Sequence, residues 1–500
     1  MKQRRVYRTL ALVGGLVVGA ALLPSLSGCR DSNPSVGQLI DAVWGGGAAF
    51  SAADQTEIKR FEAAFLKIHA QNGGRDLKHF KDAFRRVQRD YVKETQSAAL
   101  VDAAIKSLDA GDGKETTERS SGEHMASALD AMLASLDPHS SYLDPEELAE
   151  MHVATSGEFG GLGIEITMEE GLIRIVSPIE DTPAHRAGVE PGDLITHLDG
   201  TAILGMSLTE AVRMMRGRPG TDILLTLRRK GVAPFDVTIT RDIIKIRAVK
   251  WRMEDTVGYV RITSFSGKAE SGLLAAMDRI RTEGGARLSG IVLDLRSNPG
   301  GLLNQSHAVA DAFLNDGVVV AVKGRRSEHD RVFDAVSGDI AEGLPMIVLI
   351  NGGSASASEI VASALQEHGR AVVMGRRSYG KGSVQTITPL PEEGALRLTT
   401  QLYYAPSGHT IQGLGVVPDI TISREENETF KREAELPGAL SADLPAFRET
   451  RLTVAQKSCP AVGEKEDRML GCALAYLRSG SDQGFLAEIK ERQQQTSLND

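Results

Sequence analysis

Two short segments of the sequence contain residue types that could perform nucleophilic chemistry. The first, residues 352–359, reads Gly-Gly-Ser-Ala-Ser-Ala-Ser-Glu and lies between the apolar run Met346–Ile350 and a helical pattern. The apolar run predicts a buried strand, so the serines would lie in a tight turn between a strand and a helix. N–H groups at the helix start could hold an anion. The turn alone is equally typical of a nucleophile with half an oxyanion hole and of simple helix capping.

The second segment is the glycine-rich stretch 375–383, which contains Lys381. A serine hydroxyl needs a base, and a lysine can act as one only when burial lowers its pKa from about 10.4. The stretch nearly matches a phosphate-binding loop, but Gly382 stands where a Mg²⁺-binding hydroxyl is required, and a strand pattern follows. A surface lysine in a glycine loop is the other alternative. The candidate histidines lack a catalytic signature: His307, His368 and His409.

From residue 251 onward, strands alternate with helices. Alternation predicts a largely parallel sheet, and the loops at its strand ends carry the chemistry. The loop 298–301, Asn-Pro-Gly-Gly, follows the buried strand 291–295 and is a second such loop besides 352–358. After residue 422 the sequence becomes charged and helical and has no catalytic signal.

The first part of the chain is helical over about residues 54–134, and the segment 136–143 ends this region. His139 there lies next to two serines, but we favour a turn with hydrogen-bonding side chains over catalysis. Residues 157–244 then resemble a PDZ domain. The resemblance implies a glycine-rich loop that binds a peptide's terminal carboxylate, formed by Gly161, Leu162, Gly163 and Ile164.

The chain has the composition of an ordinary globular protein, and its N-terminus has the pattern of an export signal. Its 500 residues suggest about three domains, and a net charge of −9 gives no electrostatic reason to bind nucleic acid. A basic start, an apolar run and Leu26-Ser27-Gly28-Cys29 resemble a lipoprotein signal, so we expect Cys29 to be lipidated. A plain signal peptide and an uncleaved anchor are the alternatives. Cys459 and Cys472 would then form an even pair that could be disulfide-bonded in an oxidising compartment.

Taken together, the motifs resemble the carboxy-terminal processing proteases, the tail-specific serine peptidases of family S41. The resemblance spans about residues 77–422, with all motifs in the family's order. It rests above all on residues 351–360 and 380–385, and also on 136–143, 157–166, 296–301 and 406–420. It implies a crotonase/ClpP-like α/β core, with Ser356 as nucleophile, Lys381 as base and Gln385 orienting the lysine.

The resemblance also implies an oxyanion hole made by the N–H of Ala357 and that of Gly300 or Gly301. Ser354 and Ser358 would be turn or cap residues. The implied substrates are proteins with exposed apolar C-terminal tails, which the PDZ domain recognises while gating the site. No metal or organic cofactor is implied, and a homo-oligomer or an adaptor protein is a further expected partner.

The predicted fold class is therefore multidomain α/β, on the periplasmic side of a bacterial membrane. We predict these segments: a signal peptide at 1–28, a tether at 29–53, a helical domain at 54–150, a PDZ domain at 156–244, a protease core at 250–424 and a helical C-terminal segment at 425–500. An exported PDZ scaffold with an inactive core is the main alternative function. A crotonase-like acyl-CoA enzyme is a second, and the export signal argues against it.

Overall fold

The computed structural model describes residues 50–69, 73–109, 119–336, 338–423, 431–441, 449–464 and 466–497. The predicted signal peptide, Cys29 and nearly all of the predicted tether lie outside these ranges. Within them, no helix is both long enough and apolar enough to cross a bilayer.

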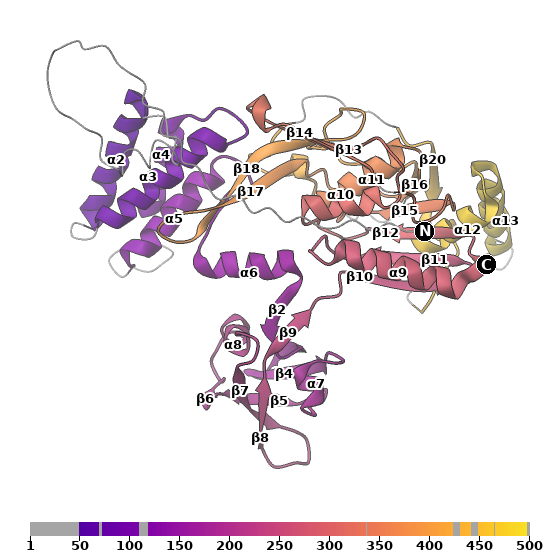
Figure 1. Cartoon of the computed structure of the whole chain (residues 1–500), viewed down its shortest axis with the longest axis horizontal. Helices are drawn as coiled ribbons and strands as arrows, with labels where there is room; N and C mark the ends of the chain where they lie inside the picture. The colour runs from indigo at the N-terminus through magenta and orange to yellow at the C-terminus, as the bar shows by residue number, and fades with distance from the viewer. Residues whose placement is uncertain are drawn as a thin grey trace, which may run out of the picture. The chain divides into compact units, whose positions relative to one another are not determined.

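Four helices form the first part of the described chain (Figure 1): α2 (Ala52–Ile68), α3 (Gly73–Asp90), α4 (Ser97–Asp109) and α5 (Ser121–Ala134). Capping boxes at Ser51 and Ser120 mark the starts of α2 and α5, where each serine is followed three residues later by an acidic side chain. The helices share one apolar core with leucines of a later hairpin, including Leu396 and Leu398. The N-terminal helices are therefore packed onto part of the protease core.

Helix α6 (Pro145–Ser156) leads into the PDZ region. The main sheet of the PDZ region has the order β3-β4-β5-β7-β8, and β6 pairs with β5. The elements of this region are β2 (Glu158–Gly161), β3 (Ile164–Glu169), β4 (Leu172–Pro178), α7 (Pro183–Arg186), β5 (Leu194–Leu198), β6 (Thr201–Ala202), α8 (Leu208–Met215), β7 (Asp222–Arg228), β8 (Phe235–Thr240) and β9 (Asp242–Lys245). Strand β3 stands at one end of this sheet.

The central sheet of the core has seven strands in the order β10-β11-β12-β15-β16-β19-β20. The pair β10–β11 is antiparallel, and each later pair is parallel. The strands are β10 (Val249–Glu254), β11 (Val257–Ile262), β12 (Gly290–Asp294), β15 (Met346–Ile350), β16 (Val372–Gly375), β19 (Ile420–Ser423) and β20 (Leu452–Ala455). Because β12 and β15 are parallel neighbours, the loops that follow them leave the same edge of the sheet.

Helices cover both faces of this sheet (Figure 1). Because side chains alternate along a strand, Ile291 and Leu293 of β12 face one core while Val292 faces the other. The first core contains α9 (Ala269–Gly284), α10 (Leu303–Asp311) and α11 (Ala357–Glu367). The second contains α12 (Arg468–Ser479) and α13 (Asp482–Ser497). This mixed α/β architecture with N-terminal helices and a PDZ domain confirms the predicted fold class.

Two features differ from the sequence prediction. The C-terminal segment is not only helical, because β20 joins the edge of the central sheet. A second, antiparallel sheet contains β1 (Ser141–Leu143), β18 (Ala395–Tyr404), β13 (Val318–Gly324) and β14 (Arg331–Asp334), and β17 (Ser383–Pro389) also pairs with β18. Strands of three or four residues, such as β1 and β20, are too short to show a periodic pattern.

Candidate active site

The three serines in the turn between β15 and α11 differ in the groups that surround them. The Ser354 hydroxyl donates to the carbonyl of Leu295 at 2.8 Å, and the Ser358 hydroxyl donates to the carbonyl of Asn298 at 2.9 Å. Both side chains are fully buried. These two serines therefore join the turn to the neighbouring loop, and only Ser356 remains as a candidate nucleophile within this turn.

Ser356 occupies a strained position at the start of α11. Its φ of 55° and ψ of −114° lie in a region that residues with a side chain rarely adopt. Burial raises the pKa of the neighbouring Tyr403 phenol to about 12. Strain of this kind persists only where the surroundings impose it, and it is common at functional sites.

Glu359 is the group that imposes this geometry. Its carboxylate is fully buried and accepts the N–H of Ser356 at 2.7 Å. It also accepts the N–H groups of Gly380 and Lys381, at 2.7 and 2.9 Å, and the hydroxyl of Ser378 at 2.5 Å. Burial raises the pKa of Glu359 to about 7, although these hydrogen bonds oppose the rise. One carboxylate thus holds the turn of Ser356 and the loop of Lys381 together.

Lys381 lies in the loop before β17. Burial lowers the pKa of its amine below the ordinary value, which favours the neutral form a base requires. The charge of Glu433 raises this pKa again, and the charge of Arg397 lowers it further. The loop is not a phosphate site, because the N–H groups of Gly380 and Lys381 point at Glu359 and a strand follows. Among the described residues, no hydrogen bond joins the Lys381 amine to the Ser356 hydroxyl.

The Asn-Pro-Gly-Gly loop lies directly against the nucleophile turn. A Cβ placed on Gly300 would come within 2.9 Å of Ser356 Cβ and 3.0 Å of the backbone nitrogen of Ala357. The Gly300 N–H donates to Asn298 Oδ1 at 2.9 Å. Within the described chain, the N–H groups of Ala357 and Gly301 have no intramolecular acceptor. Among the described residues, the Gly301 N–H therefore has no acceptor, whereas that of Gly300 is engaged within its own loop.

Gln385 lies on β17, at a register shift in its pairing with β18. Its amide nitrogen donates to Ser383 Oγ at 3.0 Å and Thr399 Oγ1 at 3.2 Å. Thr399 in turn donates to the buried Asp137 at 3.0 Å. Lys381 lies before the start of this strand. The contact between Gln385 and the lysine amine stays a prediction.

Sequence reasoning missed two groups near the lysine. Glu433, at the start of a 3₁₀ turn (Glu433–Glu435), is fully buried, and its Oε2 lies 2.8 Å from Nε2 of His139. Gln412 donates to Glu433 at 3.0 Å and accepts the N–H of Gly382 at 2.9 Å. The predicted turn at His139 is confirmed, since Asp137 accepts its N–H. No local motif marks Glu433, which lies in a charged stretch far along the chain.

The predicted PDZ loop follows β2 and opens β3. Gly163 has a φ of 78°, and a Cβ there would come within 2.3 Å of Thr182. Leu162 is buried in the core of the domain, and Ile164 packs against that core. Carbonyls of the loop are bonded within the domain, because Leu162 accepts from Ala184 and Gly163 from Ile179. Its position beside the end strand β3 is suited to a peptide that adds as a further strand.

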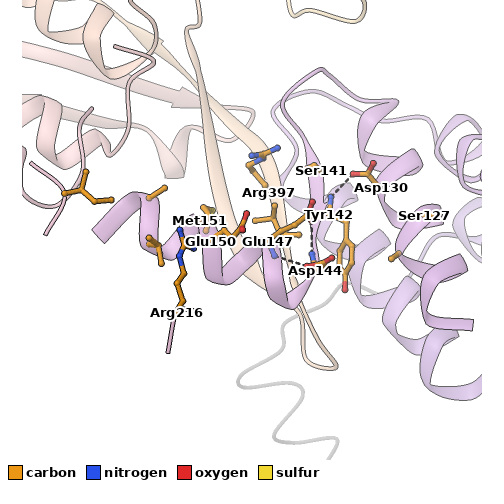
Figure 2. Close-up of a pocket in the computed structure, with 15 residues that line it drawn as sticks. Ser127, Asp130, Ser141, Tyr142, Asp144, Glu147, Glu150, Met151, Arg216 and Arg397 are labelled. Carbon is orange, nitrogen blue, oxygen red and sulfur yellow. Dashed lines mark hydrogen bonds between the residues drawn. The ribbon is translucent and has the colours of Figure 1, made fainter. Parts of the chain in front are cut away.

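A cavity of about 890 Å³ lies among α5, β1, α6, β18 and the end of α8 (Figure 2). Among the charged side chains of its lining, the acidic ones outnumber the basic ones, with Asp130, Asp144, Glu147 and Glu150 against Arg216 and Arg397. Its lining includes neither Ser356 nor Lys381, and its link to the site is the charge of Arg397. We therefore locate the chemistry by the serine turn and not by this cavity. Within the described residues, no group of acidic, histidine or cysteine side chains could hold a metal ion.

Comparisons with known proteins agree with this geometry. Residues 256–422 match peptidase family S41, and residues 174–229 match a PDZ domain. A carboxy-terminal-processing protease of Bartonella bacilliformis is 51% identical over 363 residues, which cover 72% of this chain and 78% of that protein. The chain belongs to the carboxy-terminal processing proteases of family S41. The present chain is also 31% identical to carboxy-terminal processing protease CtpA of Bacillus subtilis over 436 residues, which cover 86% of this chain and 84% of that protein.

A solved structure of the photosystem II D1 C-terminal processing protease aligns with a TM-score of 0.43 and 29% identity, over 70% of this chain and 93% of that one. The sequence relatives alone establish that this chain is a serine protease of that family.

Proposed function

We propose that Ser356 and Lys381 cleave a peptide bond by acyl transfer. Neutral Lys381 takes the proton of the Ser356 hydroxyl, and the serine oxygen bonds to the substrate carbonyl carbon. Lys381 then protonates the leaving amine, and water releases the acyl group from the serine. The observation that carries this proposal is the Glu359 carboxylate, which binds the backbone N–H groups of both residues.

The oxyanion of the tetrahedral state would bind to the N–H groups of Ala357 and Gly301. Two such donors are a common arrangement, and the loss of one donor typically costs 10²- to 10³-fold in rate. Support comes from the contact of Gly300 with Ser356 and from the engaged N–H of Gly300. Gln385 is proposed to orient the amine of Lys381 once substrate is bound.

The proposed substrates are proteins with apolar C-terminal tails, cut near those tails. The tail carboxylate would meet the loop from Gly161 to Ile164, and the tail would extend β3 as an added strand. The position of β3 at the end of its sheet supports this mode. Ser356 would then cut the substrate polypeptide whose tail is bound to the PDZ domain, so that tail binding controls the entry of substrate into the active site.

The proposed location is the periplasmic face of a bacterial membrane, with Cys29 lipidated. The lipoprotein-like segment that ends at Cys29 supports this, and the disulfide between Cys459 and Cys472 suits an oxidising compartment. A Cys29→Ser variant should move from the membrane fraction to the soluble fraction. Wild-type membrane partitioning of that variant would contradict the proposal.

The nucleophile is tested with an unfolded substrate that ends in an apolar tail. We expect Ser356→Ala to abolish cleavage, while Ser363→Ala, a matched change two turns along α11, should keep most of it. The same substrate with a charged tail tests the PDZ role, and wild-type enzyme should cut it more slowly. Retained cleavage by Ser356→Ala would exclude the assigned nucleophile, and equal cleavage of both tails would exclude tail recognition.

A further inference from the structure

The loop that contributes Gly301 begins at a residue with two acidic partners. The Arg296 guanidinium donates to Asp294, at the end of β12, with bonds of 2.9 and 2.6 Å. It donates equally to Asp467, far along the chain, with bonds of 2.9 and 2.7 Å. Both contacts use two parallel hydrogen bonds, which fix the plane of the guanidinium as well as its position.

Asp467 is the most exposed member of this arrangement, with 31% of its side chain accessible, whereas Arg296 and Asp294 are shielded from water. The side chain of Arg296 is 12% exposed, and that of Asp294 is fully buried. Burial raises the pKa of Asp467, but the hydrogen bonds and charge of Arg296, the N–H of Leu470 and the charge of Arg252 together hold that pKa below its ordinary value. Asp294 also accepts the hydroxyl of Tyr259 at 2.6 Å. Asp294 is thus a near neighbour of Arg296 in sequence with a further donor in Tyr259, whereas Asp467 belongs to the distant C-terminal segment.

Asp467 is itself held by the C-terminal segment. It is the N-cap of α12, and its carboxylate accepts the N–H of Leu470 at 3.0 Å. Helix α12 packs in the second apolar core and is joined to the preceding turn by the disulfide between Cys459 and Cys472. Helix α12, whose residues 469–475 are buried, thus holds the carboxylate that meets Arg296.

The loop needs such support because its backbone is strained. Ser297, directly after Arg296, has a φ of 56°, and Gly301 has a φ of 145°. On its other side, the loop is tied to the nucleophile turn, where Asn351 accepts the Ser297 N–H at 2.8 Å. Rotation of Arg296 would shift the loop that carries the Gly301 N–H, and errors of about 1 Å in such positions cost about 10²-fold in rate.

We propose that Asp467 is a positioning residue for the oxyanion loop, acting through Arg296. The C-terminal segment is then a part of the catalytic arrangement and not only a cover for the sheet. This inference rests on the proposed function, because it takes the loop from Ser297 to Gly301 as one side of the oxyanion hole.

The test uses Asp467→Ser, because serine caps a helix as well as aspartate but is too short to reach Arg296. Glu488→Gln is the matched control, since it removes a carboxylate that pairs with Arg478 on the same helix pair. The measurements are kcat, KM and the inhibition constant of a peptide aldehyde. When the aldehyde reacts, Ser356 Oγ bonds to its carbonyl carbon, the hydroxyl proton moves to Lys381, and the carbonyl oxygen occupies the oxyanion hole.

We expect Asp467→Ser to lower kcat by about ten- to a hundredfold, with KM unchanged. The aldehyde should bind more weakly by a similar factor, an effect that a smaller folded fraction cannot produce. Arg296→Lys should cause the same loss, and the double variant should be no worse than either single one. Asp467→Asn keeps one hydrogen-bond acceptor, so its kcat and aldehyde affinity should lie between those of Asp467→Ser and the wild type. Glu488→Gln should match the wild type in both.

Unchanged aldehyde affinity in Asp467→Ser would overturn the inference, as would fully additive losses in the double variant. The Ser356→Ala result separates this failure from that of the proposed function. If Ser356→Ala is inactive and Asp467→Ser binds the aldehyde normally, only the role of Asp467 is wrong. If Ser356→Ala remains active, the proposed function itself is wrong.

Discussion

The carboxylate of Glu359 accepts the backbone N–H of Lys381 at 2.9 Å. Because the same carboxylate also accepts the N–H of Ser356, the nucleophile turn and the base loop share one buried anchor. We expect Glu359→Gln to lower kcat at least tenfold at pH 8, where Glu359, with a pKa of about 7, is largely ionised. A glutamine amide offers one acceptor atom where the carboxylate offers two, so it cannot satisfy four donors.

The control for this variant is Glu367→Gln, at the other end of the same helix, where the side chain accepts the N–H of Ser407. It should retain wild-type kcat. A Glu359→Gln enzyme with normal kcat would show that the shared anchor is not required.

The pH dependence of the reaction should follow the charges around Lys381. Burial lowers its pKa, the carboxylate of Glu433 raises it and the guanidinium of Arg397 lowers it. Since the neutral amine is the active form, kcat/KM should rise with pH through this pKa. Glu433→Gln removes the negative charge and should move the rise to lower pH.

Arg397→Gln is the opposite control, because it removes a positive charge and should move the same rise to higher pH. The pH profiles of kcat/KM for both variants and the wild type test these signs. Shifts in the same direction for the two variants would contradict Lys381 as the titrating base.

The PDZ loop offers a test of backbone conformation with a built-in control. Gly163 and Gly188 have similar φ values, 78° and 75°, but a Cβ would meet Thr182 at 2.3 Å only at Gly163, with open space at Gly188. An alanine in this conformation costs about 1–2 kcal/mol from strain alone. Gly188→Ala should therefore lower the free energy of unfolding by about that amount, and Gly163→Ala by clearly more.

Chemical denaturation of the two variants measures the difference, and cleavage of a tailed substrate should fall further for Gly163→Ala. Equal destabilisation would mean that the loop can move away from Thr182.

The disulfide should stabilise the C-terminal segment. Cys459 and Cys472 are 13 residues apart, and closing a loop of this size stabilises a folded chain by roughly 3 kcal/mol in the chain-entropy model. We expect the double variant Cys459→Ser/Cys472→Ser to melt at a lower temperature than the wild type under oxidising conditions. With a reducing agent present, wild type should approach the double variant, whose own melting should not change.

If the reducing agent lowers the melting temperature of the double variant as much as that of the wild type, the agent does not act through this disulfide. Equal melting of the oxidised wild type and the double variant would mean that the disulfide adds no stability.

The sequence predicts those parts of the site that follow from local pattern. The apolar runs at 291–295 and 346–350 predict buried strands, and their parallel arrangement brings the loops of Gly300 and Ser356 together. Resemblance to a family selects Ser356 from three serines, and the hydrogen bonds of Ser354 and Ser358 agree with that choice.

The groups that fix and tune the site could not be predicted, because their contacts join residues distant in sequence. Glu433 and Asp467 lie in a segment whose pattern indicates only charged helices. Yet Glu433 accepts from Gln412, which binds the N–H of Gly382 beside Lys381, and Asp467 binds Arg296. Ser356 and Glu359 do have the spacing of a capping box. That spacing gives no sign that the same carboxylate would also bind the loop of Lys381.

The central claim is that Lys381 acts as the proton acceptor for Ser356, and Lys381→Arg tests it most directly. Arginine keeps the positive charge but does not lose its proton in proteins. The account predicts at least a thousandfold lower kcat at every pH up to 10, with KM for a tailed substrate unchanged. Activity within a few fold of wild type in Lys381→Arg would contradict the account.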